Sequence, residues 1–204
     1  MKQILRLWKF VLLWVIAVVF AVIGFRLLVA AGLRDWVFIG LGIPPINTAM
    51  LVRLMLFRFL QGSLIGTSQW LVIRPRIDRA EWWIVTTALG YSFGALYVDL
   101  ATYSRGYINM ASVSPLIASG LQGIGTWVFV AIGQWIVIRN QVERAFIWIL
   151  MIPLVEFVGL IVYWQVNITL GIFMVPVMSG TLLALLLSRS QKLSNIPAYD
   201  MQAT

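Results

Sequence analysis

The 204-residue chain contains no cysteine and no histidine. Without cysteine it cannot form a disulfide, a thiolate metal site, an iron–sulfur cluster or a thioether link to haem. Without histidine it lacks the commonest metal ligand and the side chain that usually carries protons near neutral pH. Catalytic pairs of serine or cysteine with histidine are excluded, and the sequence holds no phosphate-binding loop of the Walker type. We therefore expect neither a metal site nor an enzyme.

Charged residues are scarce as well. They make up 11% of the chain, against about 25% in a soluble domain, and hydrophobic residues make up 61%. Because a spanning helix needs about 20 apolar residues, this composition predicts an all-α integral membrane protein with a single transmembrane domain. The six expected spans are Phe10–Leu33, Asn47–Ile73, Glu81–Ala101, Ser114–Ile138, Ala145–Gln165 and Thr169–Ser188. Residues 35–46, with Pro44 and Pro45, are expected to form an interfacial or re-entrant piece.

The few basic residues are distributed unevenly along this pattern. With six spans, ten of them fall on one side of the membrane, and only Arg34 and Arg105 fall on the other. The ten are Lys2, Arg6, Lys9, Arg74, Arg76, Arg79, Arg139, Arg144, Arg189 and Lys192. The positive-inside rule then places both termini in the cytoplasm, with residues 189–204 as a polar cytoplasmic tail. The net charge of +8 indicates contact with lipid headgroups rather than with nucleic acid.

One hexapeptide occurs twice, 65 residues apart, as QWLVIR in Gln69–Arg74 and QWIVIR in Gln134–Arg139. From Gln69 to Ile84, nine of sixteen positions are identical to the second copy. Because both copies would enter and leave the membrane in the same direction, we expect a parallel repeat about the bilayer normal. The two helical hairpins cover about residues 47–101 and 114–165. Residues 178–189 in the last span faintly echo the motif.

Six side chains of the two copies are expected to anchor the hairpins at the membrane surface: Trp70, Arg74, Trp83, Trp135, Arg139 and Trp148. The first tryptophan and the arginine of each copy are four residues apart on one helix face, which permits a cation–π contact. Gln69 and Gln134 lie within the apolar region. They either hydrogen-bond the helices of a hairpin together or line a ligand or pigment site. Gly62-x-x-x-Gly66 is expected to face Gly90-x-x-x-Gly94 across the first hairpin.

Five charged residues are expected inside the membrane: Arg26, Arg53, Arg58, Asp99 and Glu156. A charge at the bilayer centre costs about 2.5–3.5 kcal/mol on insertion scales, so each one suggests a function. Depth predicts that Arg58 pairs with Glu156, and that Asp99 pairs with Arg53 or Arg26. Three interpretations stay open: internal ion pairs with snorkelling arginines, contact with a partner subunit, lipid headgroup or pigment, and a transport or proton pathway.

The repeated pattern of Gln-Trp, three aliphatic residues and Arg, then a short turn and Ala-x-x-Trp, resembles a group of uncharacterised multi-pass membrane proteins of cyanobacterial and Chloroflexi type. The resemblance rests on Gln69–Arg74, Ala80–Trp83, Gln134–Arg139 and Ala145–Trp148. It implies a repeated-hairpin helical fold in a bacterial inner membrane or a photosynthetic membrane. It implies no activity.

We therefore expect a non-catalytic accessory subunit that packs against other transmembrane subunits of a larger complex. The resemblance suggests a photosynthetic or respiratory complex. Bound lipid, carotenoid or a chlorophyll-type pigment without histidine ligation would fit such a subunit. The alternative is a small transporter or channel that uses the Arg58/Glu156 pair in the cavity between the hairpins.

Overall fold

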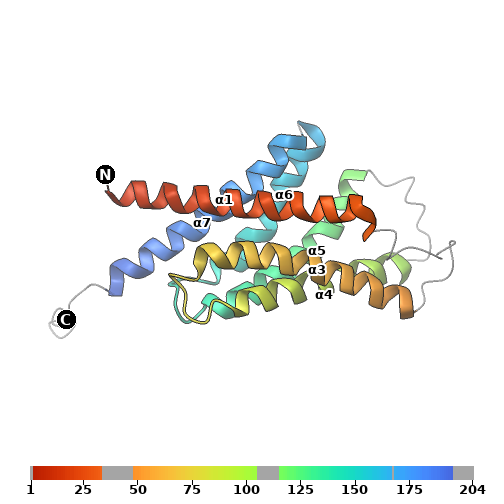
Figure 1. The fold of residues 1–204 in the computed structure, drawn as a ribbon, viewed down its shortest axis with the longest axis horizontal. Coiled ribbons are helices and arrows are strands. Elements are labelled where there is room, and N and C mark those ends of the chain that lie inside the picture. The colour runs from red at the N-terminus through yellow and green to blue at the C-terminus, as the bar shows by residue number, and fades with distance from the viewer. Residues whose placement is uncertain (1, 34–47, 105–114, 167, 195–204) are drawn as a thin grey trace.

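The structure is a computed structural model, and it describes residues 2–33, 48–104, 115–166 and 168–194. Within these ranges the chain forms helices and turns and no strand, which confirms the predicted all-α class (Figure 1). The helices are α1 (Lys2–Leu28), α3 (Thr48–Ile73), α4 (Trp82–Ser104), α5 (Pro115–Ile138), α6 (Ile147–Gln165) and α7 (Ile168–Ser194), with a wide helical turn η1 (Val29–Leu33) after α1.

Most of these helices begin and end close to the positions expected from hydropathy. The two outer helices are longer than expected, because α1 begins at Lys2 rather than Phe10 and α7 continues to Ser194 past the expected end at Ser188. Polar residues therefore extend both helices beyond their apolar stretches. At Gly32 the chain adopts φ 99°, a left-handed conformation that glycine tolerates and that ends the helical run. The segment with Pro44 and Pro45 lies outside the described residues.

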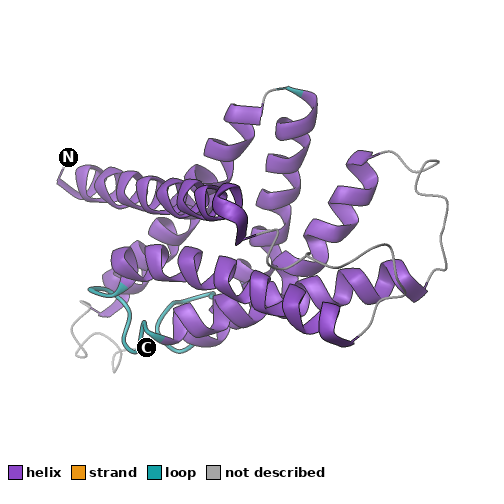
Figure 2. Cartoon of the chain, turned by 45° about the vertical axis from the view of Figure 1, so that its right-hand side comes forward, coloured by secondary structure: helices purple, strands orange, loops and turns teal. Residues whose placement is uncertain are grey.

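The helices pack in a closed ring in which each helix contacts the next. The order around the ring is α3, α4, α5, α6, α7, α1 and back to α3. Helices α6 and α7, labelled in Figure 1, are inclined steeply to α3 and α4. The connection between α6 and α7 therefore lies away from those two helices (Figure 2). The ring brings α1 and α7, from opposite ends of the sequence, side by side. These two helices therefore form a third pair beside the hairpins α3–α4 and α5–α6.

The basic segments gather at one end of this ring. The beginning of α1, the end of α7 and the two short turns after α3 and α5 all lie toward the left of Figure 1. Among the described residues, one helical stretch, Leu5–Gly32, is long and apolar enough to cross a membrane. Shorter apolar stretches occur at Gly123–Ile138, Ile147–Tyr163 and Phe173–Arg189.

The two short turns share one backbone conformation. Arg79 and Arg144 stand at equivalent positions, and both adopt left-handed angles, with φ 55° and 56°. This conformation costs a non-glycine residue about 1–2 kcal/mol, so it persists only where the surrounding structure imposes it. The amide of Ile77 donates to the carbonyl of Ile73 at 3.2 Å, and the equivalent bond in the second turn measures 2.9 Å. The sequence repeat is therefore also a structural repeat.

Each turn also contacts the neighbouring helix pair. The side chain of Gln141, in the second turn, donates to the carbonyl of Asp78 at 3.0 Å and accepts from its amide at 2.7 Å. At the equivalent position of the first turn, the guanidinium of Arg76 lies 4.6 Å from the ring centroid of Phe10 in α1. The turns thus link the three helix pairs in sequence at the basic end.

The glycines make close helix contacts, but not the expected ones. Gly62 and Gly66 pack on α4, where a Cβ added at Gly62 would lie 2.7 Å from the Cα of Ala88. Gly90 and Gly94 face α5 instead, and a Cβ at Gly90 would lie 2.6 Å from its backbone. The two motifs therefore do not meet across the first hairpin. Together they place α4 tightly between α3 and α5.

Candidate functional site

The strongest polar feature inside the ring is a repeated bond between an indole and a glutamine. In the first hairpin, Nε1 of Trp83 donates to Oε1 of Gln69 at 2.8 Å. In the second, Nε1 of Trp148 donates to Oε1 of Gln134 at 3.0 Å. Each bond joins residues 14 apart in sequence, on the two helices of one hairpin. A buried polar group needs such a partner, and these pairs satisfy both indoles.

The two copies also bond to each other. Nε2 of Gln134 donates to Oε1 of Gln69 at 3.2 Å and to Oγ1 of Thr87 at 3.0 Å. Gln134 is only 2% exposed, and the rings of Trp83 and Trp148 lie 5.9 Å apart. Both glutamines therefore hold helices together, within and between hairpins. The same amides also line a small cavity, while the interpretation of a ligand or pigment site stays a prediction.

The pair of helices from the chain ends supplies a third buried indole. Nε1 of Trp14, in α1, donates to Oγ of Ser179 in α7 at 3.2 Å. The Trp14 ring meets the Trp83 ring edge to face, with centroids 6.3 Å apart. Sequence comparison missed Trp14, because its acceptor is a serine and its partner helix lies at the other end of the chain. The faint echo of the motif in residues 178–189 was the available signal.

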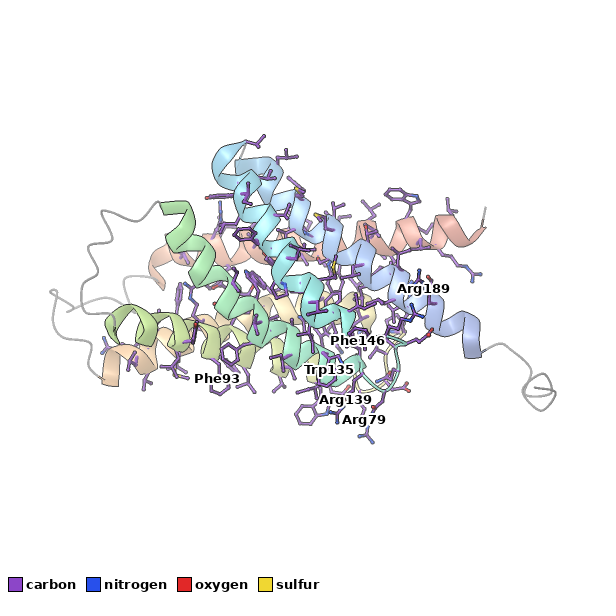
Figure 3. The ribbon with its side chains drawn as sticks, turned by 180° about the vertical axis from the view of Figure 1, so that it is seen from behind. Arg79, Phe93, Trp135, Arg139, Phe146 and Arg189 are labelled. Carbon is purple, nitrogen blue, oxygen red and sulfur yellow. The ribbon has the colours of Figure 1, made fainter. Side chains whose placement is uncertain are left out.

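The expected surface anchors divide into two kinds. Trp83 and Trp148 are 0% and 1% exposed, so they belong to the core and do not form part of an aromatic belt at the membrane surface. Trp70 and Trp135 are half-buried, and their arginines Arg74 and Arg139 lie 5.2 and 5.7 Å from the ring centroids. Figure 3 shows Trp135 and Arg139 together at the turn end of the bundle. Both cation–π contacts follow the predicted spacing.

The charged residues expected inside the membrane are arranged differently from the prediction. Among the described residues no ion pair joins Arg58 to Glu156. The guanidinium of Arg58 instead donates to Oε1 of Gln61, one turn along α3, at 2.8 Å. Tyr91 of α4 is buried and lies within electrostatic reach of both Arg58 and Glu156. The guanidinium of Arg58 therefore hydrogen-bonds an amide oxygen of its own helix and forms no described ion pair with the carboxylate.

The charged residues expected in the outer third of the membrane form no ion pair among the described residues. The side chains of Arg26 and Arg53 are exposed, as snorkelling arginines would be. The side chain of Asp99 lies outside the described part of the structure, so the expected pairing with Arg53 or Arg26 lies there too. The one described ion pair, between Arg144 and Glu143 at 3.7 Å, is exposed in the second turn and contributes little to stability.

A small cavity lies where the ring's polar groups converge. Its volume is about 20 Å³, and all six helices contribute to its lining. The polar lining residues are Gln69, Thr87, Tyr91, Gln134, Glu156 and Ser179, and Trp14, Trp127 and Trp148 supply aromatic walls. A cavity of this size accommodates about one water molecule, and it is too small for a pigment or an organic substrate. We call it the central cavity below.

The described part of the chain is a ring of three helix pairs, joined near its centre by indole–amide and indole–hydroxyl bonds. No protein-family model matches the chain, and no curated protein and no solved structure is significantly similar to it. Function must therefore be inferred from the site. Among the described residues no group of three or more acidic side chains is placed to hold a metal ion.

Proposed function

We propose that the protein is a non-catalytic transmembrane subunit that packs against a larger membrane complex. In this proposal the chain crosses a bacterial inner membrane or a photosynthetic membrane six times, with both termini in the cytoplasm. The gathering of the basic segments at one end supports this topology, because positive residues favour the cytoplasmic side. Arg79 and Arg139, which project from the turn end in Figure 3, would then contact anionic headgroups.

The observation that carries the proposal is the outer face of α1. Only 22% of the most apolar part of this helix is buried within the protein. The stretch Leu5–Gly32 is nevertheless the longest apolar helical stretch among the described residues. Its large exposed side chains follow helical spacing along one side: Leu12, Ile16, Phe20, Ile23 and Leu27. This stripe, which we call the α1 stripe, is a regular surface on which another transmembrane helix can pack.

The interior supports a structural role over a conducting one. The ring centre is filled by Trp14, Trp83 and Trp148, and the central cavity has room for about one water. A channel or transporter remains the alternative, since Glu156 borders that cavity. Such a protein would need the ring to open by breaking the bond between Gln69 and Gln134.

Purification from its native membrane in mild detergent tests the proposal. We expect the protein to migrate with a larger complex, and the resemblance makes photosynthetic and respiratory complexes the first to examine. The triple variant Leu12→Ala, Ile16→Ala and Phe20→Ala should release the protein from that complex. The matched control alters Leu150, Leu154 and Phe157, which are exposed on α6.

The control triple variant should stay bound, and both variants should keep the thermal stability of the isolated protein. Migration as a homo-oligomer alone would contradict the proposal. Solute movement in liposomes that stops on Glu156→Gln would establish the transporter instead. Equal release by both triple variants would show that the α1 stripe is not the contact.

A further inference from the structure

Several polar atoms at the central cavity lack a hydrogen-bond partner among the residues that the structure describes. Oε1 of Gln69 accepts from Trp83 and from Gln134, which fixes the orientation of this amide. Its Nε2 group then points away from these donors, and within the described residues it has no acceptor at hydrogen-bond distance. The hydroxyls of Thr87 and Tyr91 likewise donate to no described acceptor. Such donors are costly to bury without a partner, typically about 1–3 kcal/mol each.

One carboxyl group borders the same cavity. Glu156 of α6 lines it, and no described basic side chain lies within ion-pair distance. A water in the cavity would accept from the donors of α3 and α4 and donate to Glu156. The volume of about 20 Å³ suits one such water, which needs two to four polar partners. The cavity therefore supplies both the space and the bonding groups.

The surroundings accommodate both protonation states of Glu156. When the carboxyl is ionised, one water can accept from two of the donors of Gln69, Thr87 and Tyr91 and donate to the carboxylate. When it is protonated, its O–H shares the cavity with two oxygens that have room for a further donor, because Oε1 of Gln134 and Oγ of Ser179 each accept only one described bond. A group that is hydrogen-bonded in either state can gain and lose a proton without disrupting the fold.

Glu156 is the one carboxyl group among the described residues that line the cavity. Among the described lining residues, Tyr91 from α4 is the one other titratable group, and Arg58 from α3 supplies a positive charge within electrostatic reach of Tyr91. The lining residues from α1, α5 and α7 carry no charge. Charged side chains inside membranes are costly, and they commonly mark ion or proton sites.

We propose that the central cavity is a hydrated proton-binding site, in which Glu156 binds and releases a proton through one internal water. The site lies where all three helix pairs meet. A change in its charge would therefore be felt by the Gln69–Gln134 bond that holds the two repeats together. This proposal is independent of whether the protein is an accessory subunit, because it concerns the isolated chain.

Infrared difference spectroscopy of the purified protein during a pH titration tests this proposal. We expect a carboxyl C=O stretching band that titrates and that shifts in D₂O. The band should be lost in Glu156→Gln and kept in Glu143→Gln, which alters the exposed carboxylate of the second turn. A water O–H stretching band sensitive to H₂¹⁸O should change in the same titration.

A second variant provides an independent test if Glu156→Gln folds poorly. Tyr91→Phe removes one hydroxyl donor, so the midpoint of the carboxyl band should move to higher pH by about 0.5–1 unit. A wild-type protein without a titrating carboxyl band would overturn the proposal. So would a band that persists in Glu156→Gln, or a midpoint that Tyr91→Phe leaves unchanged.

Discussion

The two repeated hairpins share the residues that hold each one together but differ at positions that line the cavity between them. They share the glutamine, the buried tryptophan and the left-handed arginine, and these residues form the same bonds and the same turn in both copies. They differ at two other pairs of positions that line the central cavity on one or both sides. Tyr91 of the first copy corresponds to Glu156 of the second, and Thr87 corresponds to Ile152.

This difference separates scaffold from site. Residues that are the same in both copies hold each hairpin together, so substitutions at them should have parallel effects in the two copies. Residues that differ place one hydroxyl-bearing face against one carboxyl-bearing face. The asymmetry thus creates the polar cavity, which two identical copies would not form.

The largest expected difference between the copies concerns the two glutamines. Gln134 bonds to Trp148, Gln69 and Thr87, whereas Gln69 accepts two bonds and is less buried. We expect Gln134→Leu to lower the free energy of unfolding by about 2–4 kcal/mol and Gln69→Leu by about 1–2 kcal/mol. Chemical denaturation in detergent, followed by tryptophan fluorescence, measures both values. Equal losses would show that the centre is symmetric.

A smaller effect is expected at the contact between the hairpins. An alanine at Gly90 would place its Cβ 2.6 Å from the Cα of Val130, so α4 and α5 would have to separate. We expect Gly90→Ala to cost about 1–3 kcal/mol. Gly24→Ala is the control, because nothing lies within 4 Å of that position. A thermal unfolding temperature that falls equally in both variants would exclude close packing as the cause.

The smallest effect is expected in the turns. Glycine at position 79 or 144 relieves a left-handed strain of about 1–2 kcal/mol, offset in part by the greater freedom of glycine in the unfolded chain. We therefore expect Arg79→Gly and Arg144→Gly each to stabilise the protein by about 0.5 kcal/mol. Thermal unfolding of the two variants and the double variant should give additive shifts. Opposite signs in the two copies would show that the turns are not equivalent.

The sequence predicted the helices and the repeat well, and the contacts between helices poorly. The hexapeptides correctly indicated equivalent hairpins and the contacts of Arg74 with Trp70 and of Arg139 with Trp135. The expected pairing of Arg58 with Glu156 failed, because depth along a helix does not say toward which neighbour a side chain points. The prediction that the two glycine motifs face each other across the first hairpin was wrong for the same reason.

By itself, the sequence determined that the chain is helical, where each helix lies, and that two hairpins are copies of one another. Those properties depend on local hydropathy and on comparison within the chain. Only the tertiary structure decided that Trp83 and Trp148 are core residues, that α1 and α7 form a third pair through Trp14 and Ser179, and that Glu156 borders a polar cavity. The physical reason is that these helices are apolar on all sides, so composition does not distinguish the face that packs inward from the face that remains outside.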